Sequence, residues 1–156
     1  MLLFSMLMAG GYETLDISGD AGIRAFGSTL KELFINAATG MYSLITDTGS
    51  IAETVTVEVS VKSHSLEGLL VSWLNELVFR FDAHGFTGKS FSVISFITGD
   101  KDAADADAFS LSATVAGETF DPRRHEGRLL IKAATYHNLQ IENIDGVWTA
   151  EIIFDI

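Results

Sequence analysis

Two pairs of acidic groups in this sequence are spaced so that they could bind a metal ion. Asp16 and Asp20 bracket the Ile17-Ser18-Gly19 turn, and Asp155 stands one residue before the terminal carboxylate of Ile156. Oxygen-rich turns bind hard cations such as Ca²⁺, which takes several oxygen ligands. If the C-terminus is ordered, Asp155 and the terminal carboxylate are neighbouring anions that repel unless a cation or hydrogen-bond donors compensate. Both pairs are therefore candidate cation ligands.

Each pair also has a simpler explanation that the sequence leaves open. Asp and Ser side chains stabilise turns by accepting hydrogen bonds from nearby backbone amides, with no metal involved. A chain terminus often frays, and its carboxylate is then solvated by water. A hydrolase built around Asp20, Asp155 and a metal would need a nucleophile or general base as well, and no such arrangement supports it in the sequence.

A third acidic segment, 99–108, carries four Asp residues. The EF-hand pattern requires acids at positions 1, 3 and 5 and Gly at position 6. Counting from Asp100, position 5 is Ala104 and position 6 is Asp105, so the pattern is not met. We expect this segment to be a solvated acidic loop.

The remaining residue types exclude several kinds of chemistry. The chain has no Cys, which excludes disulfides, thiolate metal ligands and a Cys nucleophile. The GxGxxG, P-loop, HExxH and GxSxG signatures are absent. Neither predicted helix places two His residues at metal-ligand spacing. The four His residues are His64, His84, His125 and His137.

The net charge is −11, from 21 acidic and 10 basic residues. A general nucleic-acid binder needs a basic surface, so we expect little direct binding of nucleic acid. An acidic protein instead attracts cations and basic protein surfaces. Four of the bases lie between Arg123 and Lys132. They either form a basic patch for an acidic partner or a phosphate group, or balance nearby acids such as Asp121 and Glu126.

The length of 156 residues, with 47% apolar and 20% charged residues, is typical of one globular domain. Residues 1–11 are apolar, but roughly 20 residues are needed to cross a bilayer, and no Lys or Arg precedes them as in a secretory signal. We interpret residues 1–11 as a mis-assigned start, a cloning remnant or a loosely packed arm before a single domain at 12–156. We expect a soluble, cytoplasmic protein.

Hydrophobic periodicity predicts an α+β domain, with two helices packed on a mainly antiparallel β-sheet. Thr29 and Glu32 have the spacing of a capping box at the start of the first helix, which should fade near Thr46-Asp47. The second apolar stripe, from Leu66 to Phe81, ends at His84-Gly85, where Gly suits a helix C-terminus.

The strands are predicted from alternating runs on either side of these helices. The Asp145-Gly146 dipeptide between two such runs is a strong hairpin signal and favours antiparallel pairing. The predicted strands are 12–16, 22–26, 54–61, 86–97, 109–118, 129–144 and 147–156.

Five segments of the chain, in order, resemble the signature of the archease family, and together they span residues 12–156. The segments are the opening 12–27, the helical 29–38 with Met41 and Thr46-Asp47, the second-helix segment 69–77, the Lys132-Ala-Ala-Thr-Tyr-His137 motif and the terminal Phe154-Asp-Ile156. A match of five separate segments in the right order is far more specific than any single motif.

The resemblance implies a non-enzymatic accessory protein of RNA processing. Archeases assist the GTP-dependent RNA ligase that joins RNA ends carrying a 2′,3′-cyclic phosphate or a 3′-phosphate, as in tRNA splicing. They promote guanylylation and multiple turnover of that ligase. Some are linked instead to a tRNA cytosine methyltransferase, as a chaperone that limits aggregation. The implied partner is therefore an RNA ligase or, alternatively, a methyltransferase or another client protein, with no membrane involved.

The resemblance also implies a divalent-metal site, described in the family as calcium. Its ligands correspond in this sequence to Asp20, Asp155 and Ile156. Residues expected in an outer shell or in contact with a partner are Asp16, Asp47, Lys132 and His137. The chain departs from the family where the usual His-Thr-Ala before the ligand Asp is replaced by Ile17-Ser18-Gly19, which keeps a hydroxyl but removes an imidazole.

Overall fold

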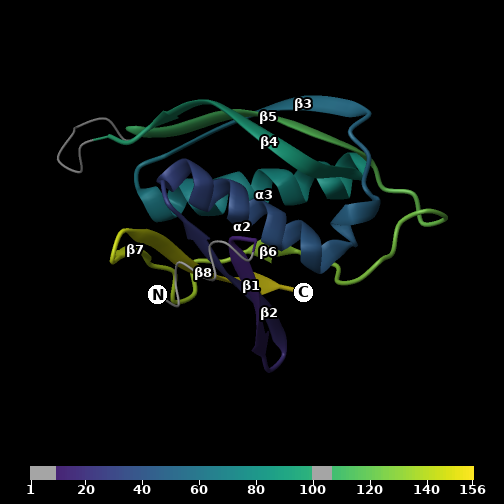
Figure 1. Ribbon diagram of the computed structural model, residues 1–156, viewed down its shortest axis with the longest axis horizontal. Helices are drawn as coiled ribbons and strands as arrows, with labels where there is room; N and C mark the ends of the chain where they lie inside the picture. The colour runs from purple at the N-terminus through teal and green to yellow at the C-terminus, as the bar shows by residue number, and fades with distance from the viewer. Residues whose placement is uncertain (1–9, 100–106) are drawn as a thin grey trace.

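The computed structural model describes residues 10–99 and 107–156, and this part of the chain has three layers. A three-stranded sheet lies on one side, two α-helices lie in the middle, and a five-stranded sheet lies on the other side (Figure 1). The predicted α+β class is confirmed, but the strands form two sheets and the helices lie between them. Most of the predicted N-terminal arm and of the predicted acidic loop falls outside the described residues.

All strand pairs in both sheets are antiparallel. The five-stranded sheet has the order β1-β2-β8-β6, and β7 also pairs with β8. Its strands are β1 (Tyr12–Ile17), β2 (Asp20–Gly27), β6 (Ala133–Ala134), β7 (Ile141–Ile144) and β8 (Val147–Asp155). The three-stranded sheet has the order β3-β5-β4, with β3 (Val55–Ser63), β4 (Phe86–Ile97) and β5 (Phe109–Thr119).

The first helix, α2 (Leu30–Ile45), begins at the predicted capping residues. The Thr29 Oγ1 atom accepts a hydrogen bond from the Glu32 amide at 3.1 Å, as the spacing predicts. The Glu32 carboxylate accepts from the Ser28 hydroxyl at 2.6 Å rather than from the Thr29 amide. Thr46 caps the far end of the helix. A short 3-10 turn, η1 (Thr48–Ser50), follows.

The second helix, α3 (Leu66–His84), ends at Gly85 as expected. Gly85 has φ +68°, a left-handed conformation that glycine adopts without strain, and its amide donates to the Phe81 carbonyl at 2.7 Å. Within residues 10–99 and 107–156, no helix is long and apolar enough to cross a membrane.

The core lies on both sides of the helical layer. Trp73 of α3 is 1% exposed, and its Nε1 donates to the Phe34 carbonyl of α2 at 3.0 Å, so the indole joins the two helices with its polar atom satisfied. On the five-stranded side, a Cβ at Gly40 of α2 would lie 2.9 Å from Cδ1 of Ile23 in β2. The missing side chain therefore lets α2 approach that sheet closely.

The prediction of one strand over 129–144 is wrong, because only β6 and β7 are strands in this range. The chain before β6 instead binds the end of a helix. The Arg128 and Leu129 amides donate to the Ile45 and Leu44 carbonyls of α2, each at 2.9 Å. Carbonyls in the last helical turn have no partner within the helix, so this segment satisfies two of them and cannot form a sheet ladder there.

Both tight hairpins of the five-stranded sheet form at the expected turns. Asp145 and Gly146, between the paired Ile144 and Val147, have φ +52° and +88°, which is typical of a type I′ turn. Ser18-Gly19 joins β1 to β2, and this hairpin projects below the body of the protein in Figure 1. Asp20 therefore lies at the base of an exposed turn.

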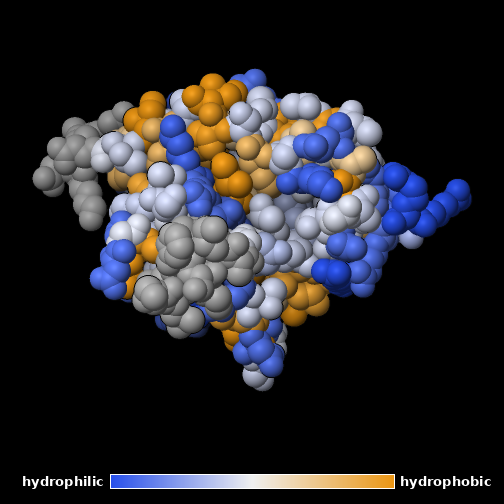
Figure 2. All heavy atoms as spheres, viewed as in Figure 1, coloured by the Kyte–Doolittle hydropathy of each residue, from blue (hydrophilic) through white to orange (hydrophobic). Residues whose placement is uncertain are grey.

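A buried polar cluster closes the end of the three-stranded sheet. Glu118 of β5 is 3% exposed, and its carboxylate accepts from the Ala52 amide at 2.8 Å and from the Arg124 guanidinium. The buried His125 accepts at Nδ1 from the Asp121 amide at 2.8 Å. Its Nε2 lies 2.6 Å from Glu118 Oε1, a close contact without the direction of a good hydrogen bond. The cluster anchors the loop after β5, which Figure 2 shows as a strongly hydrophilic projection.

This cluster sets the pKa of two carboxyl groups. Burial alone would raise the pKa of Glu118, but hydrogen bonds from Ala52 and Arg124 outweigh it, so the pKa is lower than its ordinary value. The amide of Arg123, which donates to Asp121 at 2.9 Å, lowers the pKa of that carboxyl as well. Arg124 and Arg128 pair with neighbouring acids, as the charge-balancing explanation of the basic segment predicts.

Replacing Glu118 by Gln should make the free energy of unfolding less dependent on pH in acid. The folded pKa of Glu118 lies below its ordinary value of 4.5, so ionised Glu118 stabilises the fold above that pH. The contribution is lost as the pH falls through the folded pKa. In urea unfolding from about pH 7 to pH 3, E118Q should have a lower free energy of unfolding than wild type, and this difference should shrink below pH 4.5. Glu126→Gln, at an exposed position of the same loop, is the control. A difference between E118Q and wild type that stays constant with pH would contradict the lowered pKa of Glu118.

Candidate metal site on the outer face of the five-stranded sheet

The β2–β8 pairing brings distant parts of the chain together. The last registered pair is Ala21 opposite Phe154, and one further step along the strands places Asp20 opposite Asp155. Opposed residues on adjacent strands have Cα atoms roughly 4.5–5.5 Å apart. The Lys132 amide donates to the Asp155 carbonyl at 2.8 Å, which fixes the end of β8 from its other side. The predicted ligands Asp20 and Asp155 are therefore neighbours, and Ile156 follows directly.

Side-chain alternation puts both carboxylates on the face of the sheet that points away from the helices. Phe154 is fully buried in the core and Ala21 is 5% exposed, and these two residues oppose each other. Because successive side chains of a strand point to opposite faces, Asp155 and Asp20 both point outward. Both residues are exposed. Two like charges thus share one open surface.

A hollow of about 270 Å³ lies on this outer face beside Asp20. Gly22 is essential to its shape, because a Cβ there would lie 2.9 Å from Cδ1 of Ile17 and 3.2 Å from Cδ1 of Ile153. The two isoleucines therefore line the hollow as apolar surface next to the Asp20 carboxylate. The residues that line it are Ile17, Asp20, His137, Asn138, Glu151 and Ile153.

The segment after β6 supplies a second wall of this hollow. Ala133 pairs with Asp155, and the Thr135 amide and hydroxyl donate to the Ile153 carbonyl at 3.0 and 2.8 Å. His137 follows, and its amide lies 3.3 Å from Thr135 Oγ1. The structure therefore places His137 beside Asp20, while Lys132 is exposed and touches Asp155 through its backbone.

Two residues expected in an outer shell or in contact with a partner, Asp16 and Asp47, do not lie beside Asp20 and Asp155. Asp16 pairs with Ala21 in the β1–β2 ladder, so its side chain lies on the same face as Ala21 and opposite to Asp20. Asp47 caps η1, where its Oδ1 accepts a hydrogen bond from the Gly49 amide at 3.0 Å. The two-residue turn pairs Asp20 with Ile17, so Asp20 shares the face of Ile17, and alternation along β1 puts the preceding Asp16 on the other face.

The donor set at this end of the sheet fits a hard cation. Among residues 10–99 and 107–156, no three side chains of His, Cys, Asp and Glu are grouped so that they could hold a metal. The family resemblance adds the backbone carboxylate of Ile156 to Asp20 and Asp155 as a third charged ligand. All three groups offer oxygen, which suits Ca²⁺, and water would have to complete its six to eight ligands.

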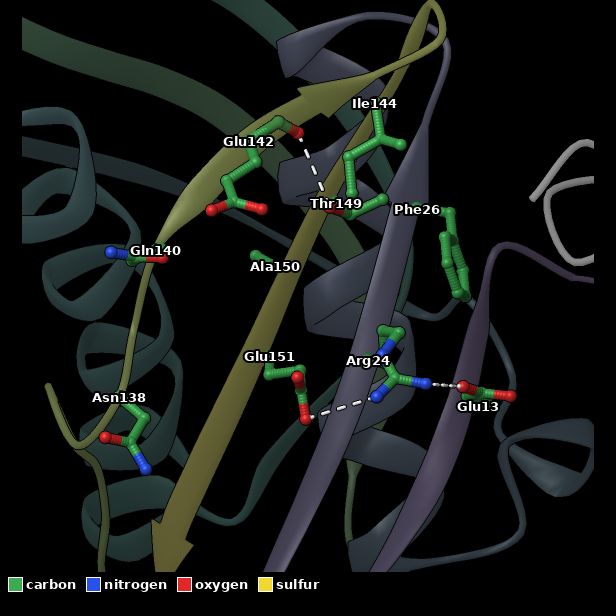
Figure 3. A pocket seen from close by; sticks show the side chains of 10 residues that line it. All are labelled: Glu13, Arg24, Phe26, Asn138, Gln140, Glu142, Ile144, Thr149, Ala150 and Glu151. Carbon is green, nitrogen blue, oxygen red and sulfur yellow. Dashed lines mark hydrogen bonds and ion pairs between the residues drawn. The ribbon is translucent and has the colours of Figure 1, made fainter.

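Sequence reasoning missed a row of charges beside this hollow. Glu13, Arg24 and Glu151 oppose one another across β1, β2 and β8, and Arg24 pairs with Glu13 and, at 3.4 Å, with Glu151 (Figure 3). They line a larger hollow of about 480 Å³, which shares Asn138 and Glu151 with the smaller one. The hairpin pattern could have paired Glu13 with Arg24, but Glu151 joins only through the long-range register.

The chain is similar to known proteins over nearly its whole length. The model of the Archease protein family (MTH1598/TM1083) matches residues 12–156. Protein archease of Methanosarcina acetivorans is 35% identical over 145 residues, which cover 93% of this chain and 95% of that protein. Protein archease of Aeropyrum pernix is 33% identical over 150 residues, covering 96% of this chain and 100% of that protein.

Two solved structures share the fold. The solution structure of Methanobacterium thermoautotrophicum protein 1598 has a TM-score of 0.77 and 34% identity, and covers 94% of this chain and 99% of its own. The crystal structure of a Thermotoga maritima archease, described as a possible chaperone, has a TM-score of 0.60 over 92% of this chain and 96% of its own. At 18% identity, the second likeness supports the fold alone. Taken with the family match and the archaeal relatives, these findings establish that the chain belongs to the archease family.

Proposed function

We propose that this protein is an accessory factor of RNA processing that activates a GTP-dependent RNA ligase. It promotes guanylylation and multiple turnover of the ligase, and it uses a divalent cation, Ca²⁺, held by Asp20, Asp155 and Ile156. Membership of the archease family supports the ligase as partner. The observation that carries the metal site is the β2–β8 register, which sets Asp20 beside Asp155 on one exposed face.

A cation bound by these residues would reduce the repulsion between their carboxylates and would stabilise the folded state. Asp20, Asp155 and the terminal carboxylate carry like charges at short range, and a bound Ca²⁺ would compensate their repulsion. Because Asp20 begins β2 and Asp155 ends β8, a cation held by both would also tie the two strand ends together. A ligand that binds only the folded state stabilises it by mass action.

The charge of the protein favours an accessory role beside an RNA-binding enzyme. The net charge of −11 favours docking beside a basic, RNA-binding enzyme and disfavours direct binding of RNA. We therefore propose that the ligase performs the chemistry and that this protein acts by contact with it.

A chaperone-like role toward a tRNA cytosine methyltransferase or another client is the second candidate. Leu130 and Tyr136 lie on either side of β6 and are 65% and 61% exposed. Exposed apolar side chains of this size can contact a client protein. The Thermotoga maritima archease is itself described as a possible chaperone. This role predicts suppressed aggregation of the client with no effect on RNA ligation.

Adding the wild-type protein to its cognate ligase with GTP and Mn²⁺ should raise the rate of multiple-turnover joining. Asp20→Asn and Asp155→Asn should each reduce the stimulation about tenfold, because each removes a charged ligand. Asp16→Asn is the matched control, since it makes the same charge change on the opposite face of the same hairpin. Absence of stimulation by the wild-type protein would refute the ligase hypothesis.

Calcium should raise the melting temperature of the wild-type protein. At about 100 times the dissociation constant, a ligand adds ~2.7 kcal/mol, which corresponds to roughly 5–10 °C for a domain of this size. Asp20→Asn and Asp155→Asn should abolish the calcium-dependent shift in differential scanning calorimetry, and Asp16→Asn should retain it. A shift that persists in both ligand variants would place the cation elsewhere.

A further inference from the structure

Two polar side chains of α3 hold the segment that connects β6 to β7. The Asn75 side chain makes two hydrogen bonds with Ala134 of β6, accepting from its amide at 2.7 Å and donating to its carbonyl at 3.2 Å. Further toward the start of α3, Glu67 Oε1 accepts from the Ile141 amide of β7 at 3.4 Å. The helix therefore contacts the backbone at both ends of this connection.

The Asn75 amide takes the place of a neighbouring strand. A strand of two residues has little stability of its own, and β6 has β8 as its only partner strand in the described sheet. A carboxamide carries one acceptor and donors in the arrangement of a peptide group, so it can satisfy both backbone groups of one residue. Ala134 is thus paired with Phe154 of β8 on one side, while its backbone amide and carbonyl both bond Asn75 on the other.

The position of β6 determines the geometry of the acidic end of the sheet. The Lys132 amide bonds the Asp155 carbonyl, and His137, which lines the hollow with Asp20, comes three residues after β6. We infer that Asn75 is a positioning residue, which holds the 132–137 segment against the end of β8 and so fixes His137 and Asp155 relative to Asp20. This inference rests on the proposed metal site, although Asn75 itself contacts none of the proposed ligands.

The protein offers a matched control on the other helix. Asn36 of α2 donates from Nδ2 to the Phe26 carbonyl of β2 at 2.7 Å, which is also a contact from a helix Asn to the backbone of the five-stranded sheet. Phe26 lies near the end of β2 opposite to Asp20. Asn36→Ala removes a similar hydrogen bond without touching the 132–137 segment.

The test uses full-length wild type, Asn75→Ala and Asn36→Ala, with two measurements. The first is amide hydrogen exchange of Lys132 and Thr135, whose amides bond β8. The second is calorimetric titration with CaCl₂. Asn75→Ala should speed exchange at both amides and weaken calcium binding, each by about tenfold. Asn36→Ala should leave both measurements at wild-type values. Asn75→Asp keeps the acceptor for the Ala134 amide, and provides a folded variant if Asn75→Ala does not fold.

The outcomes separate the inference from the proposed function. Unchanged exchange at Lys132 and Thr135 in Asn75→Ala overturns the inference, whatever happens to calcium. Faster exchange with unchanged calcium affinity overturns the inference that Asn75 positions the metal site. An equal loss of calcium affinity in Asn36→Ala would show a general effect of lost stability and would also overturn the inference about Asn75. A wild-type protein that binds no calcium refutes the proposed metal site, while the exchange rates still decide whether Asn75 holds the segment.

Discussion

The antiparallel pairing of β2 with β8 is the contact on which the rest of the structure depends. It joins residues 21–27 to residues 148–154, and it places β8 between β2 on one edge and the short strands β6 and β7 on the other. The inner face of this pair packs against the helices, whereas the outer face carries the acidic groups. A single register therefore sets both the core and the candidate site, since a slip of one residue would exchange the two faces.

Local signals predicted most of the elements but not their arrangement. The Thr29 cap, the Gly85 helix end and the Asp145-Gly146 hairpin each depend on residues close together in sequence, and all three form as expected. The division into two sheets depends on long-range pairing, which periodicity does not encode. The start of the predicted strand 129–144 is not a strand, because its apolar run lies where the Leu129 amide bonds the end of α2.

Only part of the candidate site could be predicted from the sequence, because its arrangement also depends on long-range strand pairing. Charge and family resemblance identified Asp20 and Asp155, and the register then placed them side by side. Resemblance also suggested Asp16, but strand alternation turns it to the other face. Nothing in the sequence analysis singles out Asn75, since its role depends on a backbone segment 59 residues away. Ile17 contributes an apolar side chain to the hollow beside Asp20.

The place of β8 in the sequence has a consequence for biosynthesis. A ribosome delivers the β1–β2 hairpin well before the strand that pairs with the other edge of β2, so the five-stranded sheet closes only after β8 has been translated. Until then, β2 offers an unpaired edge and an apolar face to other nascent chains. The β1–β2 hairpin of this chain therefore depends on a segment more than 100 residues away to complete its sheet.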